Sequence, residues 1–425
     1  MSVAFRTSRW TAIVAAIAIC LAAPTAANAD PGDIVVFDDP NLKACVADAL
    51  EVAATSDITE AQMATLTELV CQSESIVTIT PLQYATNLTQ LWLTSNEIVD
   101  VSALSSLTDL QVLHLGTNRI VDVSPLAGLP NLELLNLTDN EVADISPLTG
   151  MASLTTLLAG LNQIVDASVM SGTPNLDTLF VGENDITGLS LVNLPNLTEL
   201  RAAGNEISEI SFTGAPGLRY LELSNNQISD LSAVAGLTSL ESLYAAENHL
   251  RDISPAGNLP NLMHWWLVDQ EIAVGPAYAG VPTDIPEVLD FNGAPLQVTV
   301  AIGSGTIAGN TVTWTDPTDP SVLAWSTGAT AYSGALVYSP VLAGEAPSID
   351  EAASNLPTGV VGSEYAGMIA MSGVPAPTVE LTGDDLPAGL SLSADGVLSG
   401  VPVVAGSFSF EVTASNGVDP DAVAE

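Results

Sequence analysis

Positive charge is nearly absent from this sequence. Its 425 residues include seven lysines and arginines against 49 aspartates and glutamates, for a formal net charge of −42. After the N-terminal Arg6 and Arg9, the basic residues are Lys43, Arg119, Arg201, Arg219 and Arg251. A surface this acidic repels nucleic acid and anionic lipid headgroups, so the sequence predicts no nucleic-acid partner. It leaves room for weak divalent cation binding or a basic partner, although the solubility of a secreted protein explains it equally well.

The residues that carry most enzyme chemistry are also scarce. The only histidines are His114, His249 and His264, and none belongs to an H-E-x-x-H pair. Lys43 is the only lysine and lies in a predicted helix, which excludes a P-loop. No G-x-S-x-G elbow occurs, and no acidic segment has the ligand spacing of an EF-hand. The sequence therefore predicts no enzyme activity, no cofactor and no dedicated metal site.

Long apolar runs are limited to the first residues of the chain. Arg6 and Arg9 precede an apolar run over 10–23, and Ala27-Asn28-Ala29 follows. This order predicts a secretory signal peptide over residues 1–29, because the run is too short for a membrane-spanning helix. An N-terminal anchor is the less favoured alternative. No later segment is apolar enough to span a bilayer, so we expect no membrane insertion of the mature chain.

Cysteine is rare, and only Cys45 and Cys71 remain after the predicted cleavage. In an oxidising compartment such a pair suggests one disulfide. Two buried thiols explain the same pair equally well.

What the sequence has in abundance is one spacing of leucines. The segment LPNLELLNLTDNEVADISPL, residues 129–148, belongs to a frame that recurs at steps of 22 residues, with two steps of 21. The first leucine of the frame is found at Leu88, Leu110, Leu132, Leu154, Leu176, Leu197, Leu218, Leu240 and Leu262. Eight units carry asparagine eight positions later, and the ninth carries Gln270. This L-x-x-L-x-L-x-x-N pattern predicts a leucine-rich repeat solenoid.

The repeat spacing also predicts how one coil is built. Leu135 and Leu137 point to the same side because strand side chains repeat every two residues. We expect Asn140, where the chain leaves the strand, to bond the backbone of its own and the next coil. Six inward side chains at about 1.5–3 kcal/mol each do not offset the ordering of one coil, so coils must stack and their ends need covers.

Different sequence patterns flank the repeats. Asp39-Pro40 begins one predicted helix, and Thr59 with Gln62 forms the capping box of a second, before a degenerate first coil in frame at Leu66. Beyond Ile272, β-branched and alternating segments separated by Gly and Pro predict two all-β modules. The predicted division is 1–29 signal peptide, 30–74 helical cap and degenerate repeat, 75–272 repeats, 273–343 first β module, and 344–425 second β module. A module of the second kind normally has one more strand after a segment such as DPDAVAE, so we expect a fragment or further modules in the native gene.

Several segments resemble the internalin family of bacterial surface proteins. FDDPNLKACVADAL resembles their helical cap, DVSPLAGLPNLELLNLTDNEVADISPL their 22-residue repeat, and LVDQEIAVGPAYAGVPTDIPEVLDFNGAPL their passage into an immunoglobulin-like adaptor. Residues 386–416 resemble the Ig-type modules of secreted bacterial proteins. The implied fold is a solenoid with a concave parallel sheet, a 3-10 or irregular convex side, an α-helical cap and two C-terminal Ig-like modules. The implied function is adhesion to, or recognition of, a protein partner at the cell surface or outside the cell. An L-P-x-T-G sorting signal is not present, so the mode of envelope attachment stays open.

The repeat frame also predicts where a partner binds. In each strand, the residue between the second and third frame positions faces solvent on the concave sheet. This row consists of Trp92, His114, Asn136, Leu158, Phe180, Arg201, Glu222, Tyr244 and Trp266, with Tyr220 one column over. Four of the nine are aromatic in a chain that is only 5% aromatic. We predict partner-binding roles for Trp92, His114, Phe180, Arg201, Tyr220, Glu222, Tyr244 and Trp266.

The aromatic row is also compatible with a purely structural role. Aromatic residues are favoured on any sheet face, and Trp266 has the option of packing on the adaptor. The solenoid would then be a structural spacer of an envelope or stalk protein, or part of a carbohydrate-binding appendage. Two architectural expectations follow from the frame: one core shared by cap, repeats and adaptor, and deletions on the convex side of the two short coils.

Overall fold

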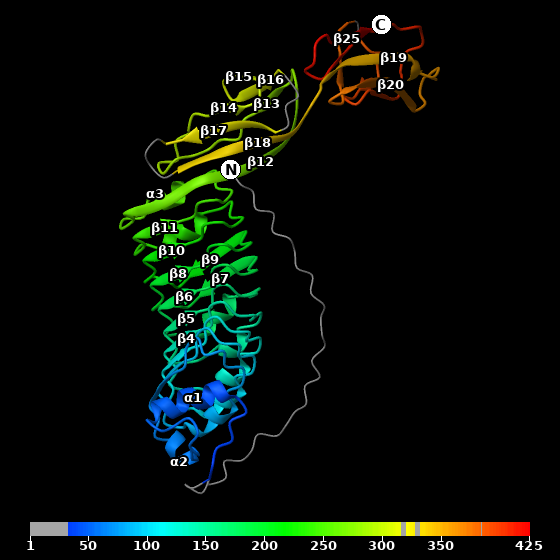
Figure 1. Cartoon of the computed structure of the whole chain (residues 1–425). Helices are drawn as coiled ribbons and strands as arrows, with labels where there is room; N and C mark the ends of the chain where they lie inside the picture. The colour runs from blue at the N-terminus through cyan, green and yellow to red at the C-terminus, as the bar shows by residue number, and fades with distance from the viewer. Residues whose placement is uncertain (1–32, 316–319, 328–331, 384) are drawn as a thin grey trace.

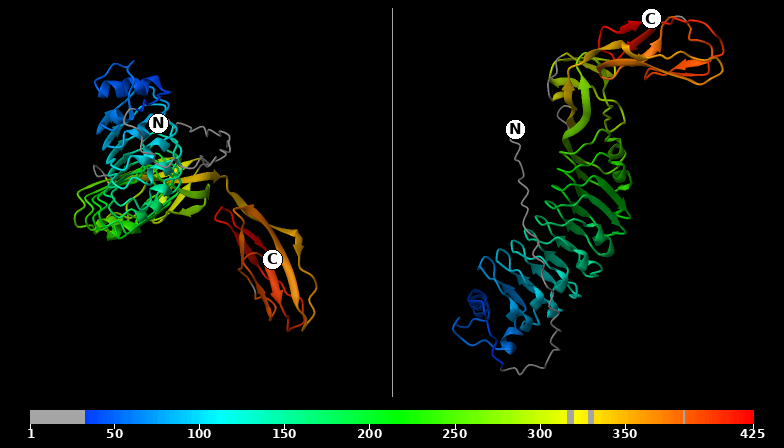
Figure 2. Two further views of the ribbon diagram at one scale, coloured as in Figure 1. Left: turned by 90° about the horizontal axis from the view of Figure 1, so that it is seen from below. Right: turned by 90° about the vertical axis from the view of Figure 1, so that its right-hand side faces the viewer.

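A ladder of short parallel strands forms the main sheet of the molecule. The computed structural model describes residues 33–315, 320–327, 332–383 and 385–425, so the predicted signal peptide lies outside the described residues. The ladder strands are β1 (Glu68–Val70), β2 (Gln90–Trp92), β3 (Val112–His114), β4 (Leu134–Asn136), β5 (Thr156–Leu158), β6 (Thr178–Phe180), β8 (Glu199–Arg201), β10 (Tyr220–Glu222), β11 (Ser242–Tyr244) and β12 (His264–Tyr278). Each pairs with the next, and the stack forms the curved solenoid of Figures 1 and 2.

The leucines of the frame line the interior of this solenoid. Leu132, Leu135 and Leu137 are fully buried, and their equivalents in the other coils are buried as well, except Leu262 and Trp265, which are half-buried. One hydrophobic core runs without interruption from Val35 in the cap to Val341 in the adaptor. The predicted solenoid, and the core that its cap and adaptor share, are therefore confirmed.

The asparagine column ties neighbouring coils together, although in the opposite direction from the one expected. Asn140 donates through Nδ2 to the carbonyl oxygens of Leu115 at 3.0 Å and Leu137 at 2.9 Å. Its Oδ1 accepts from the backbone N–H of Ile120 at 3.0 Å. These partners belong to its own coil and the preceding coil, so the expected bond to the next coil is wrong. Gln270 makes the equivalent bonds in the last coil, to Ala245, Leu267 and Leu250.

Two helices, α1 (Pro40–Ala49) and α2 (Glu60–Met63), cover the N-terminal end of the stack. The Asp39 side chain caps α1, accepting from the backbone N–H groups of Asn41 and Leu42. Thr59 and Gln62 form the predicted capping box of α2. Cys45 of α1 and Cys71, the residue after β1, form a disulfide across a sequence separation of 26.

The convex side consists mainly of 3-10 turns, as expected. They are η1 (Thr80–Tyr84), η2 (Ser102–Ser106), η3 (Ser124–Leu126), η4 (Ser146–Leu148), η5 (Ser168–Gly172) and η6 (Ser232–Gly236), and a one-turn helix α3 (Ser254–Gly257) replaces the turn in a later coil. Most begin at an Asp-x-Ser sequence, where the aspartate accepts from the serine N–H, as Asp144 does from Ser146 at 2.8 Å. This bond orients the backbone into the turn.

The two short coils depart from this pattern. Their convex segments form β7 (Gly188–Val192) and β9 (Glu209–Thr213), which pair in parallel as a separate two-stranded sheet. At the Asp position of the motif these coils have Gly188 and Glu209, so the aspartate that begins the turn is missing. The parallel strands of the concave sheet continue through these coils without a register shift from Leu179 to Leu200 and Leu221. The deletion therefore lies on the convex side as predicted, but the segment extends into a strand instead of tightening.

The adaptor continues the same sheet at the C-terminal end of the repeats. Strand β12 runs from the last coil beyond residue 272 and pairs in parallel with β18 (Tyr332–Leu342). Strand β18 pairs with β17 (Ser321–Ser326), which pairs with β14 (Thr299–Ile302). A second sheet holds β13 (Pro282–Asp284), β16 (Thr311–Trp314) and β15 (Gly305–Ala308). The Tyr332 hydroxyl donates to the carbonyl of Leu250 at 3.1 Å, which fastens the adaptor to the repeats.

A separate β module follows the adaptor (Figure 1). One of its sheets has β19 (Glu345–Asn355), β20 (Tyr365–Val374), β23 (Val397–Gly400) and β22 (Leu390–Leu392). The other has β21 (Thr378–Leu381), β24 (Val412–Ser415) and β25 (Ala422–Ala424). Its small core, with Ile369, Val379 and Val412 buried, is distinct from the solenoid core. In the described part of the chain, no helix has the length and apolarity that crossing a membrane requires.

Candidate binding site on the concave face

The concave face carries the predicted row of solvent-facing side chains in unbroken register. Adjacent strands pair in the order Trp92, His114, Asn136, Leu158, Phe180, Arg201, Glu222, Tyr244 and Trp266. The residues that flank each of them in the strand point inward, so these nine form one row on the opposite face. Eight are half-buried by their neighbours, and Trp266 is 52% exposed. We call this row and Tyr220 the concave ladder.

A cation lies between two aromatic rings at the centre of the concave ladder. The guanidinium carbon of Arg201 is 4.5 Å from the centroid of the Phe180 ring and 4.5 Å from that of Tyr220. Its Nε donates to Oε1 of Glu199 at 2.6 Å. Glu222 is its register neighbour on the next strand, but the carboxylate that pairs with Arg201 is Glu199. The positive charge is therefore matched within the molecule.

Tyrosines extend this cluster toward the adaptor. The rings of Tyr220 and Tyr244 lie 5.4 Å apart with planes tilted by 33°. The Tyr220 hydroxyl is 3.5 Å from Oε2 of Glu222, whose Oε1 accepts from the backbone N–H of Ser224 at 3.1 Å. Burial raises the pKa of Tyr220 above its ordinary value, while the Arg201 charge opposes the rise. The hydroxyl therefore stays protonated at neutral pH and is available as a donor.

The N-terminal part of the ladder is aromatic and uncharged. Trp92 and His114 stack with ring centroids 5.8 Å apart and planes 9° from parallel. Nδ2 of Asn136 lies 3.5 Å from Nδ1 of His114. Burial lowers the pKa of His114, so the imidazole is mostly neutral at pH 7. This end of the ladder therefore offers ring faces without positive charge.

At the C-terminal end of the ladder, two adjacent tryptophans point in opposite directions. Trp265 occupies an inward frame position and contacts Phe291 of the adaptor, edge to face, with ring centroids 5.1 Å apart. Trp266 is the exposed neighbour. The indole that packs on the adaptor is thus Trp265, and Trp266 remains on the open concave face.

Glu199 and Leu161 were not in the predicted row, and only Glu199 belongs to a strand of the concave sheet. Glu199 lies two residues before Arg201 in β8, and the period of two would have placed them on one face. Leu161 is 52% exposed and has a φ of 56°, a left-handed conformation that costs leucine energy. The corresponding position holds Thr117, Asp139 and Asn225 in other coils, which also have positive φ.

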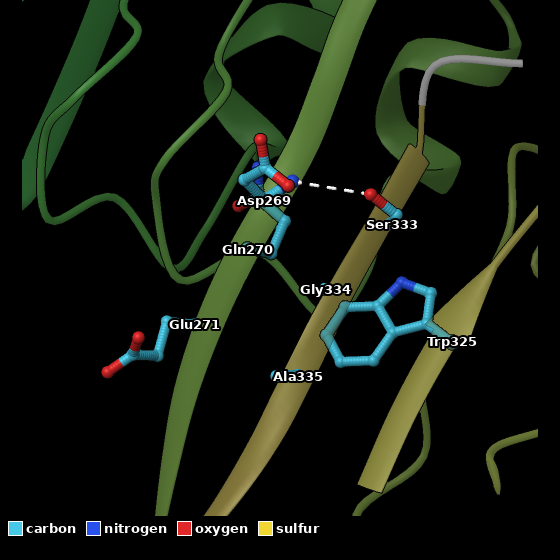
Figure 3. Close-up of a pocket in the computed structure, with 7 residues that line it drawn as sticks. All are labelled: Asp269, Gln270, Glu271, Trp325, Ser333, Gly334 and Ala335. Atoms are coloured by element: carbon cyan, nitrogen blue, oxygen red, sulfur yellow. Dashed lines mark hydrogen bonds between the residues drawn. The ribbon is translucent and has the colours of Figure 1, made fainter. Parts of the chain in front are cut away.

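A shallow hollow of about 420 Å³ lies where the repeats meet the adaptor (Figure 3). It is lined by Asp269, Gln270, Glu271, Trp325, Ser333, Gly334 and Ala335. The pairing of β12 with β18 is irregular here, with a register shift between Leu267 and Gln270. A Cβ on Gly334 would lie 2.5 Å from the Trp325 ring, so glycine is needed for the indole to pack. The described residues include no cluster of three or more potential metal ligands here or elsewhere.

Comparison with known families agrees with this architecture. Residues 86–128 match the family model described as "Leucine Rich repeats (2 copies)", and residues 206–250 match "Leucine rich repeat". Residues 346–420 match "Putative Ig domain". The fold and these matches define a leucine-rich repeat protein with a C-terminal Ig-like module.

Solved structures add a narrower relationship. Internalin C2 from Listeria monocytogenes is 32% identical, over 55% of this chain and 95% of that chain, with a TM-score of 0.46. Internalin inlF from the same organism is 28% identical, over 55% and 89%, with a TM-score of 0.30. The plant peptide hormone receptor RGFR1 in complex with RGF2 is 24% identical, over 47% and 35%, with a TM-score of 0.42. No curated protein sequence matches the chain. On its repeat motifs and its identity to internalin C2, the chain belongs to the internalin-like leucine-rich repeat proteins.

Proposed function

We propose that this chain is a secreted or cell-surface protein that binds a protein partner through the concave ladder, and that it is not an enzyme. Proteins of its family are typically non-enzymatic, and leucine-rich repeat proteins of internalin and receptor type bind proteins, as RGFR1 binds RGF2. We further propose a role in adhesion and the division at 30–74, 75–272, 273–343 and 344–425, with a signal peptide at 1–29.

The observation that carries this proposal is the central cluster of the ladder. Phe180, Arg201, Tyr220 and Tyr244 come from four consecutive strands and contact one another in series. Their contacts fix the side chains before a partner arrives, so little conformational entropy is lost on binding. Aromatic and arginine side chains that are partly exposed and held in this way are typical of binding hot spots.

The test starts from a partner found by screening the purified protein against host-protein, bacterial-protein and polysaccharide arrays. Binding of that partner is then measured for Phe180→Ala and Tyr244→Ala. We expect unchanged folding and a loss of about 1–2 kcal/mol for each variant, which is a 5- to 30-fold rise in Kd.

Phe408→Ala in the Ig-like module is the matched control, because Phe408 is an aromatic residue 46% exposed outside the solenoid. It should leave the Kd unchanged. Normal binding by both ladder variants, together with loss of binding in Phe408→Ala, would show that the solenoid is a spacer. A partner found only on the polysaccharide array would instead favour a carbohydrate-binding role.

A further inference from the structure

Three of the four arginines in the repeats form ion pairs with carboxylates of the molecule itself, and Arg251 is the fourth. Arg119 pairs with Glu97 at 3.1 Å, and Nε of Arg219 donates to Glu241 at 3.0 Å. Arg201, the only arginine of the concave ladder, pairs with Glu199 and lies between two rings. Acidic residues far outnumber these three arginines, and the whole chain has a formal net charge of −42. The long-range field therefore attracts basic partners and repels acidic ones.

The contacts of Arg201 show what the ladder rings are able to hold. Its guanidinium lies 4.5 Å from the ring centroids of both Phe180 and Tyr220, within the distance at which a cation is attracted to a ring face. A carboxylate two residues away in the same strand, Glu199, supplies the counter-charge. A ring face, a second ring face and an adjacent carboxylate thus form a guanidinium site inside this molecule.

A second group of two ring faces and a carboxylate lies closer to the adaptor, and no cation from the described residues lies between its rings. Tyr244 and Trp266 are register neighbours on adjacent strands, and Trp266 is 52% exposed. Glu222 is the register neighbour of Tyr244 on the other side. Among the described residues its carboxylate forms no ion pair and accepts from Ser224 and, at 3.5 Å, from Tyr220. Two ring faces and a carboxylate therefore lie together here with no basic side chain between them.

From this repetition, and resting on the proposed function, we propose that the partner is a basic polypeptide segment. Its arginine or lysine side chains lie on the rings of Tyr244 and Trp266, with Glu222 as the counter-charge. The net negative charge of the protein accelerates the encounter, and the rings with Glu222 determine where the basic segment settles.

An oligoarginine peptide is the probe, with an oligoglutamate peptide of equal length as its control. Titration of the full chain should give binding of oligoarginine that weakens with added salt, and no binding of oligoglutamate. In the double variant Tyr244→Leu/Trp266→Leu, we expect the Kd for oligoarginine to rise about fivefold to tenfold, because the leucines keep apolar volume but remove the ring faces. Glu222→Gln should raise it severalfold.

Glu141→Gln is the matched control for charge, because Glu141 is an exposed carboxylate outside the concave ladder. It should change the Kd less than twofold. An equal effect of Glu141→Gln and Glu222→Gln, with no effect of the leucine double variant, would overturn the proposal, since the peptide would then bind through net charge alone. Absence of oligoarginine binding would overturn it as well.

Failure of this inference is distinguishable from failure of the proposed function. If an array partner requires Phe180 and Tyr244 but oligoarginine does not compete with it, the concave face binds proteins and the basic-segment proposal is wrong. If oligoarginine binds the ladder and array partners are insensitive to every ladder variant, the concave-face function is wrong.

Discussion

The carboxylate of Asp39 joins the cap to the first coil of the solenoid, because its Oδ2 accepts from the backbone N–H of Val77 at 2.7 Å. The same side chain accepts from Asn41, Leu42 and Thr78. Burial raises the pKa of Asp39, but these four donors outweigh it, so the pKa lies below its ordinary value. Asp39 is therefore an N-cap and a link between two structural units at once.

Asp39→Ala should lower the stability of the N-terminal cap by about 1–2 kcal/mol at pH 7, the upper range for loss of an N-cap. Because the folded pKa is depressed, the stabilisation by the ionised carboxylate is present above the unfolded pKa of about 3.9 and is lost as pH falls through the folded pKa. Urea unfolding of Asp39→Ala and of the parent protein, at pH 7 and at a series of acidic pH values, measures the difference in their free energies of unfolding. This difference should shrink as the pH falls. Asp38→Ala is the control, and a pH-independent difference for Asp39→Ala would contradict this account.

The column of asparagines predicts a large loss of stability when one of these side chains is truncated to alanine. Asn140 is 8% exposed and satisfies two carbonyl groups and one N–H of the backbone. Asn140→Ala leaves the buried N–H of Ile120 without its acceptor, at about 1–3 kcal/mol if unrelieved by water. It also removes one of the two donors to each carbonyl, since Asn118 still donates to Leu115 and Asn162 to Leu137. We expect a drop of at least about 2 kcal/mol in the free energy of unfolding by urea.

Asn131→Ala serves as the comparison, since exposed Asn131 makes a single bond, to the Thr108 carbonyl at 2.9 Å. It should cost less than about 1 kcal/mol. Equal losses for Asn131 and Asn140 would mean that the column does not hold the coils together.

The repeat frame explains why so much of the solenoid was predictable from sequence. The period of 22 fixes where each strand lies, and the alternation within a strand fixes which residues face the concave side. Leu179, Leu200 and Leu221 stay in register across both short coils for this reason. The row from Trp92 to Trp266 therefore follows from the order of residues along the chain.

Features that depend on contacts between coils were not predictable in this way. Among the described strands, β7 and β9 pair only with each other, so their sheet depends on two short coils being adjacent. These two coils lack the Asp-x-Ser sequence. That absence is informative only once the other coils show that the sequence begins the convex 3-10 turn. The choice of Glu199 over Glu222 as the partner of Arg201 depends on side-chain rotamers, which the repeat frame does not specify.

The disulfide of the cap predicts a redox-dependent stability. Linking Cys45 to Cys71 closes a loop with a sequence separation of 26, which restricts the unfolded chain. Reduction should destabilise the cap by about 2–4 kcal/mol in the usual range for such loops. Thermal unfolding with and without dithiothreitol measures the shift. The double variant Cys45→Ser/Cys71→Ala should unfold early under both conditions, and a reductant effect that persists in it would exclude the disulfide as the cause.

Leu161 predicts a substitution that stabilises the protein. It is exposed and has a φ of 56°, whereas Asn225 meets a φ of 55° at the equivalent position of another coil. Leu161→Asn should raise the free energy of unfolding by about 0.5–1 kcal/mol, because asparagine tolerates this conformation better. The reciprocal change Asn225→Leu should lower it by a similar amount. Denaturant midpoints of both variants check the pair, and a shift of the same sign in both would contradict the conformational explanation.

Arg201 predicts a change in the titration of a neighbouring tyrosine. Burial raises the pKa of Tyr220, and the positive charge of Arg201 partly offsets this effect. Arg201→Met removes the charge but keeps an unbranched apolar side chain between Phe180 and Tyr220, so the pKa of Tyr220 should rise further. Arg201→Lys should leave the pKa closer to that of the parent protein, because it keeps the charge. Ultraviolet titration of phenolate absorbance, with Tyr220→Phe to assign the signal, measures the shift. If the Arg201→Met variant titrates like the parent protein, the guanidinium does not lie on the Tyr220 ring in solution, and the ordered cluster on which the binding proposal rests does not form.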